Sequence, residues 1–121
     1  MSAEAQPDAG QYVRLGELYL AAGDSVGAER TWRAALVRDP YSFGAHNNLG
    51  RLYHGLKSRL QERQHLEFVV RYFPDYDAGA YLLLADVYRQ VGEPRAAARV
   101  LRKGRRVFPE DAQLQRQARA D

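Results

Sequence analysis

The stretch that decides the fold lies near the start of the chain, at residues 12–19, which read Tyr-Val-Arg-Leu-Gly-Glu-Leu-Tyr. Its key positions are an aromatic residue, a Leu–small pair three residues later, and a Tyr three residues after the small one. Related stretches return at residues 46–53 and 81–88. In a helix these positions share one face. The pattern therefore predicts three copies of an amphipathic helix.

The spacing of the copies is regular over the rest of the repeat as well. Pro40 and Pro74 are 34 residues apart, and Pro74 and Pro109 are 35 apart. The extra residue falls between Pro74 and Tyr81, in a predicted turn where insertions are tolerated. Each copy is thus about 34 residues long, which is enough for two helices and their turns.

In its period and its signature residues the chain resembles the tetratricopeptide repeat family over about residues 9–111. The resemblance implies an all-α fold, a right-handed α-solenoid of three helix-turn-helix repeats with a short C-terminal capping helix. The expected divisions are an N-terminal tail at 1–8, repeats at 9–42, 43–77 and 78–111, and a short capping helix or tail at 112–121.

Start and stop signals predict where the individual helices lie. Gly23 and Gly92 end a first helix, and Pro94 fits the first turn of the helix that follows. Ser58 has capping-box spacing to Gln61. The predicted helices are 9–22, 25–38, 43–55, 58–73, 78–91, 94–107 and about 110–119.

The second repeat departs from the pattern of the other two. Glu62 stands where Ala28 and Ala97 stand, at a position that is normally small because paired helices cross there. We expect a local displacement or rotation of the helix that carries Glu62. His46 takes a site that is aromatic in the other repeats.

The resemblance implies a function in protein–protein interaction, as a scaffold or adaptor that holds a peptide or protein segment in a concave groove lined by the first helices. The positions left over after the core is assigned are the expected groove residues. They are Val13, Glu17, Leu20, Asn47, Asn48, Arg51, His54, Leu82, Asp86 and Arg89.

One subset of the family clamps the acidic tail of heat-shock chaperones with Lys, Asn and Arg side chains in this groove. Only Asn48 matches that set here. Val13 and Glu17 stand at the first-repeat positions, and Gly79 and Leu83 stand at those of the third. The sequence therefore predicts no dicarboxylate clamp.

Composition excludes several other classes of function. The chain has no cysteine, so disulfides and thiolate metal sites are ruled out. Its three histidines lie in different predicted helices and phases, and no nucleotide, nucleophile or zinc motif occurs. We expect no enzyme activity, no cofactor and no metal. Arginine-rich composition suggests a bacterial source, and we expect a cytoplasmic location unless a signal was removed or the chain belongs to a longer protein.

An alternative function comes from a basic strip in the third repeat. The simpler interpretation is that the strip is a solvated outer face. The functional interpretation is that it binds nucleic acid or an acidic partner. We expect the aromatic residues to be used in the core, which argues against nucleic acid. The strip consists of Arg95, Arg99, Arg102, Lys103, Arg105 and Arg106.

The C-terminal end suggests a further contact. Leu114 is the only large apolar residue of the last segment, which is a thin cover for the third helix pair. The sequence therefore predicts a homodimer or a further domain packed at this end.

Overall fold

The computed structural model describes residues 5–120, with side chains described as far as Gln117. The first four residues of the predicted N-terminal tail, and Asp121 of the predicted capping segment, lie outside this range. The described part contains seven helices. They are α1 (Ala9–Ala21), α2 (Ser25–Arg38), α3 (Phe43–Gly55), α4 (Arg59–Tyr72), α5 (Ala78–Gln90), α6 (Pro94–Val107) and α7 (Ala112–Ala120).

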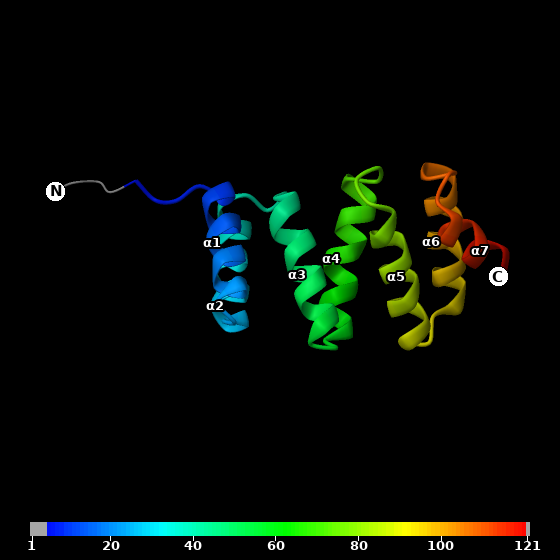
Figure 1. Ribbon diagram of the computed structural model, residues 1–121, viewed down its shortest axis with the longest axis horizontal. Helices are drawn as coiled ribbons and strands as arrows, with labels where there is room; N and C mark the ends of the chain where they lie inside the picture. The colour runs from blue at the N-terminus through cyan, green and yellow to red at the C-terminus, as the bar shows by residue number, and fades with distance from the viewer. Residues whose placement is uncertain (1–4, 121) are drawn as a thin grey trace.

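The helices form sequential antiparallel pairs stacked in a row, with the two ends of the chain at opposite ends of the row (Figure 1). Contacts run from each helix to the next along the chain, and α1 also touches α3. This confirms the predicted all-α repeat fold. Within residues 5–120, no helix combines the length and the apolar character that crossing a membrane requires.

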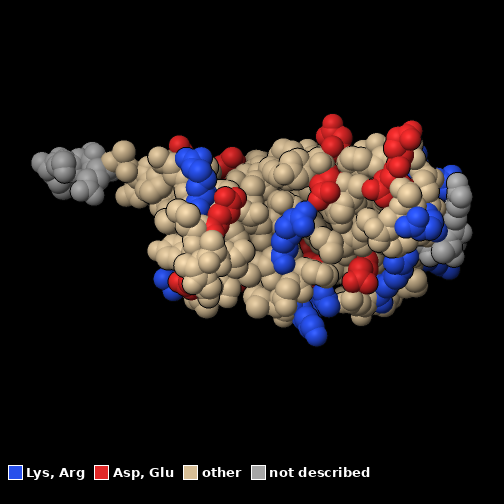
Figure 2. Space-filling model, viewed as in Figure 1, with Lys and Arg blue, Asp and Glu red and all other residues tan. Residues whose placement is uncertain are grey.

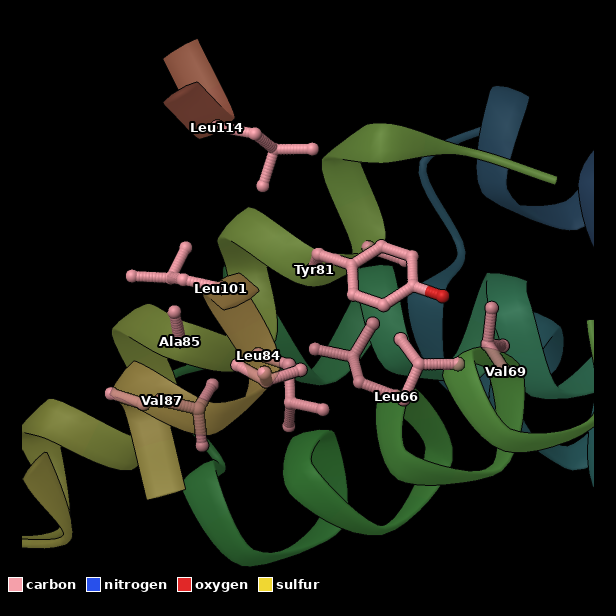
Figure 3. Close-up of a cluster of buried hydrophobic side chains, with 12 residues drawn as sticks. Leu66, Val69, Tyr81, Leu84, Ala85, Val87, Leu101 and Leu114 are labelled. Carbon is pink, nitrogen blue, oxygen red and sulfur yellow. The ribbon is translucent and has the colours of Figure 1, made fainter. Parts of the chain in front are cut away.

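The core consists of two clusters that follow the repeat. One is built from α2 and α3 around Trp32, Leu49 and Tyr53. The other runs from α4 to α7, and Figure 3 shows Leu66, Tyr81, Leu101 and Leu114 converging in it. Because each cluster joins neighbouring helix pairs, the pairs depend on one another for burial.

The turns inside the helix pairs share one backbone conformation. Gly23 and Gly92 have φ of 83° and 80°, as a glycine at the end of a first helix should. In the second repeat the equivalent position is Lys57, which adopts φ of 58°. A side chain at this φ is strained, so this turn is less favourable than the other two.

The predicted capping box in the second repeat is wrong. Ser58 does precede α4, but its side chain makes no capping hydrogen bond. A capping box occurs instead at the start of α1, where the Asp8 carboxylate accepts from the Gln11 N–H at 2.7 Å and the Gln11 side chain accepts from the Asp8 N–H.

The thin cover expected at the C-terminal end is not found. Leu114 of α7 is fully buried and belongs to the cluster drawn in Figure 3, which also contains Tyr81 and Leu101. Among the described residues, no large apolar side chain beyond Tyr76 is strongly exposed. One leucine covers the last helix pair because it enters the core instead of lying on it; the predicted contact at this end stays a prediction.

Candidate binding cleft

A cleft of about 340 Å³ opens between α1 and α3. Its walls come from both helices and its floor from Trp32 of α2, so it exists only because two repeats meet there. The lining is mostly apolar, with three polar side chains. The lining residues are Glu17, Leu20, Trp32, Asn48, Arg51, Leu52, Gly55 and Leu56.

The polar side chains of the cleft are held by hydrogen bonds. The Asn48 amide donates to the Glu17 carboxylate at 3.2 Å across the cleft. Arg51 forms an exposed ion pair with Asp77 at 2.6 Å, and Asp77 also accepts from the Gly79 N–H at the start of α5. Asn48 therefore faces an acidic group, while the Arg51 guanidinium is shared with the next repeat.

The structure brings four of the predicted groove residues together in this cleft: Glu17, Leu20, Asn48 and Arg51. The other six predicted residues do not line it. Val13 and Leu82 are half-buried against the core clusters. Asp86 accepts from Gln90 on its own helix, and Arg89 donates to Gln117.

Sequence reasoning missed four residues of the lining. Trp32 and Leu52 occupy core positions of the repeat, and Trp32 is only 1% exposed, so their part in the lining was not expected. Gly55 and Leu56 lie where α3 ends. The signal that could have found them is the position of Leu20, the residue directly after the signature of α1, because a side chain there reaches the end of the neighbouring first helix.

Inside the second repeat, the end of α3 makes a polar contact with α4. His54, the counterpart of Leu20, donates through Nδ1 to the Glu62 carboxylate at 2.6 Å. Arg59 donates to the other carboxylate oxygen at 2.9 Å. Glu62 is fully buried, and both of its oxygens are thereby paired, as a buried charge requires.

Two histidines that the sequence placed in separate phases meet in the second repeat. His46 Nδ1 lies 2.9 Å from His65 Nδ1, and His46 Nε2 donates to the Pro40 carbonyl at 2.8 Å. Burial lowers the pKa of His46, with the Pro40 carbonyl opposing it. Burial, the His46 ring and Arg33 together lower the pKa of His65 to about 4. Both rings are therefore neutral at pH 7.

The predicted basic strip is only partly available to a partner. Lys103 is half-buried and donates to the Val70 carbonyl at 2.9 Å. Arg95, Arg99, Arg102 and Arg106 are exposed and recur along one face of α6, and no ion pair involves them within the described residues. On the face shown in Figure 2, by contrast, acidic and basic side chains are intermixed.

Not all aromatic residues are used in the core. Tyr41, Tyr72 and Tyr76 are strongly exposed near the turns that flank the second repeat. Tyr41 and Tyr72 pack edge to face with ring centroids 5.7 Å apart, and Arg71 lies over the Tyr72 ring. The expectation that the core would absorb them is wrong, because these rings stack on one another at the surface.

The described residues contain no group of three or more His, Asp or Glu side chains that could hold a metal ion. Three of the four ring nitrogens of the histidine pair are already engaged, because the two Nδ1 atoms contact each other and His46 Nε2 donates to the Pro40 carbonyl.

Comparisons with known proteins agree on the repeat. Residues 78–121 match the family model described as tetratricopeptide repeat. No curated protein matches the chain in sequence.

Several solved structures share the fold. The N-terminal domain of stress-induced protein-1 from C. elegans has a TM-score of 0.78 at 19% identity, over 93% of this chain and 92% of its own. The first TPR of Spaghetti, solved with an HSP90 peptide, has a TM-score of 0.76 at 17% identity, over 93% and 89%.

A MamA crystal structure has a TM-score of 0.73 at 18% identity, over 88% of this chain and 57% of that one. The chain spans less than two thirds of the MamA chains that it matches. Since these identities are low, the solved structures bear on the fold. Residues 78–121 match the family model, and the repeat spacing and the fold extend the likeness to the tetratricopeptide repeat over the rest of the chain.

Proposed function

We propose that this chain is a protein-interaction module that binds a peptide segment in the cleft between α1 and α3, with a bulky apolar side chain of the peptide seated between Leu20 and Leu52. The single observation that carries this proposal is the cleft itself, an apolar hollow with polar groups at its rim. Ligand sites commonly have this composition, because apolar area supplies affinity and a few polar groups set orientation.

The chemistry of the rim supports an extended segment as the ligand. Asn48 can both donate to and accept from a peptide backbone, since its amide has both kinds of group. Arg51 is half-exposed despite its ion pair with Asp77 and can reach an acidic side chain. Tetratricopeptide repeats serve in protein–protein interactions, and the Spaghetti domain was solved with a bound peptide.

The rim also argues against an acidic C-terminal tail as the ligand. Glu17 stands in the cleft and accepts from Asn48. A carboxylate approaching Asn48 would meet the charge of Glu17, and like charges at this range repel. A neutral or mixed segment with an apolar anchor fits the cleft better.

The test is a selection from a displayed random-peptide library, followed by fluorescence anisotropy with the selected peptides. We expect them to share one bulky apolar residue and to bind the Leu20→Lys variant at least about tenfold more weakly, because burying such a side chain contributes about 2 kcal/mol. Leu20 is exposed, so the change should not disturb folding.

The matched control is Val37→Lys, which adds the same charge to an exposed position outside the cleft. It should leave peptide binding unchanged. Peptides that bind wild type and Leu20→Lys equally well, or that lose binding equally with both variants, would contradict the proposal.

A second candidate is binding of a polyanion along α6. Four exposed arginines without ion pairs recur along about 16 Å of one helix face, at 1.5 Å per residue. Such a row can follow a nucleic acid backbone. Binding of a mixed-sequence DNA oligomer should then weaken steeply with salt and disappear in Arg102→Glu/Arg106→Glu. An Arg14→Glu variant, changed on α1, should bind as wild type does; equal binding by all three proteins rejects this candidate.

A further inference from the structure

The two ends of the solenoid differ in how many large apolar side chains they expose. At the N-terminal end, Leu15, Leu18 and Tyr19 of α1 and Val26 of α2 are 39–67% exposed. At the C-terminal end, Leu114 is fully buried and closes the last helix pair. The open end thus carries several large apolar side chains in water, which a solenoid end normally avoids with a polar cap.

The same surface is covered in the other repeats. Leu49 and Leu84, the counterparts of Leu15, are buried to 1% exposure or less. The helix that covers them belongs to the preceding repeat: α2 packs on α3, and α4 packs on α5. The molecule therefore shows twice that this face of a first helix is built to receive another helix.

The polar part of this contact also recurs. Arg33 of α2 donates to the Tyr53 hydroxyl, and the Tyr88 hydroxyl donates to Glu67 of α4. Tyr19 is the counterpart of both tyrosines, and no hydrogen bond of its side chain occurs within the described residues. The exposed face of α1 can therefore pack against a helix that carries apolar side chains and a polar or cationic side chain.

We propose that this helix is α1 of a second copy of the chain, in a twofold dimer formed through the N-terminal ends. Head-to-tail stacking would require an open surface at the other end, which α7 closes. If the N-terminal faces of two copies pack against each other, the result is a symmetric dimer with a two-fold axis, and such dimers are the commonest form of oligomer.

The pattern of α1 suits an antiparallel pairing with itself. Its exposed stripe consists of Gln11, Leu15, Leu18 and Ala22, spaced by four, three and four residues, and it carries no charge. In a register centred between Gly16 and Glu17, Leu15 lies opposite Leu18 of the partner subunit. Gln11 then lies opposite Ala22 of the partner subunit, so the register pairs the whole stripe. The two copies bring no like charges together along the stripe.

The first test is sedimentation velocity over a range of protein concentrations up to about 1 mM. Wild type should pass from monomer to dimer, and Leu18→Lys should stay monomeric, because each dimer would bury two unpaired charges. Leu18 is 67% exposed, so the monomer should keep its fold. The control Leu60→Lys changes a side chain on α4 that is 71% exposed, and it should dimerise as wild type does. A wild type that stays monomeric, or a Leu18→Lys variant as dimeric as wild type, overturns the proposal.

The second test addresses the register, using the absence of cysteine from the chain. Leu15→Cys and Leu18→Cys proteins are mixed under mild oxidation. The register predicts that the mixture forms cross-linked dimers faster than either protein alone. Faster linking of each variant to itself overturns the antiparallel register. A peptide that binds the cleft in the monomeric Leu18→Lys variant would show that cleft function and dimerisation are separate.

Discussion

The first and second repeats solve the same packing problem in different ways. Where α1 crosses α2, Gly16 faces the indole of Trp32 and Ala28 is fully buried beside them. A methyl group on Gly16 would lie 2.3 Å from Trp32 Nε1. This crossing is closed by one large rigid side chain that fits against one residue without a side chain.

Where α3 crosses α4, the corresponding residues are Gly50, Leu66 and Glu62. A methyl group on Gly50 would lie 3.5 Å from Leu66 and His65, which is ordinary contact. The same helix pair holds the buried carboxylate of Glu62, which is paired with His54 and Arg59. The repeat frame therefore tolerates a charge at a helix crossing when the charge is paired and the opposing side chain is smaller than Trp.

The largest expected effect comes from filling the tighter crossing. Gly16→Ala should lower the free energy of unfolding by about 3 kcal/mol, because the indole is rigid and cannot yield to the added methyl. Urea unfolding followed by Trp32 fluorescence measures it.

Gly50→Ala is the matched control at the looser crossing. It should be neutral or stabilising by up to about 1 kcal/mol, since alanine favours helix over glycine. The third repeat already has Ala85 at this position, opposite Leu101. Equal losses in both variants would show that the two crossings do not differ as described.

The next effect concerns the buried carboxylate. Glu62→Ala should cost about 2 kcal/mol, because it leaves a cavity and removes the partner of His54 and Arg59. The loss is smaller than for a fully buried pair, since the side chains of both partners are partly exposed and can return to water. Glu62→Gln should cost less than Glu62→Ala in the same urea assay. A more stable Glu62→Ala protein would mean that the crossing closes on alanine as in the other repeats.

The histidine pair should make the second repeat sensitive to acid, by about 1–2 kcal/mol. Both pKa values are lower in the folded chain than the usual 6.5, and that of His65 is about 4. The stabilisation is therefore complete above pH 6.5 and is lost as the pH falls from 6.5 toward 4.

His46→Tyr should reduce that loss, because it removes one of the two coupled rings. The tyrosine can take over the hydrogen bond to Pro40, as the Tyr81 hydroxyl donates to the Pro74 carbonyl at 2.7 Å. Urea midpoints of both proteins from pH 7.5 to 4 make the comparison. Parallel curves would exclude the pair as the source of the sensitivity.

The smallest effect concerns the turn of the second repeat. Lys57→Gly should stabilise the chain by about 0.5–1 kcal/mol, because the strain of a side chain at positive φ outweighs the entropy that glycine loses on folding. Gly92→Ala, the reverse change in the third repeat, should destabilise by a similar amount. Thermal unfolding by circular dichroism measures both, and a destabilised Lys57→Gly protein would contradict the argument.

Most of the fold could be predicted, while the candidate site could be predicted only in part. The predicted helices match the observed ones within two residues at each end. Four of ten predicted groove residues line the cleft. Trp32 takes part in the lining although it belongs to the core and is only 1% exposed. The position of a residue on a helix predicts a single direction for its side chain. A large ring, however, can pack in the core and also line a cleft.

The sequence alone determined the repeat, the helix ends and the positions of the glycine turns, because these follow from a local period and from backbone preferences of single residues. Only the tertiary structure decided that His46 meets His65, that Glu62 is paired inside a crossing, that one junction opens into a cleft, and that the exposed apolar end is the N-terminal one. These features depend on the sizes of side chains that face one another across helices, and no spacing along a single helix reports them.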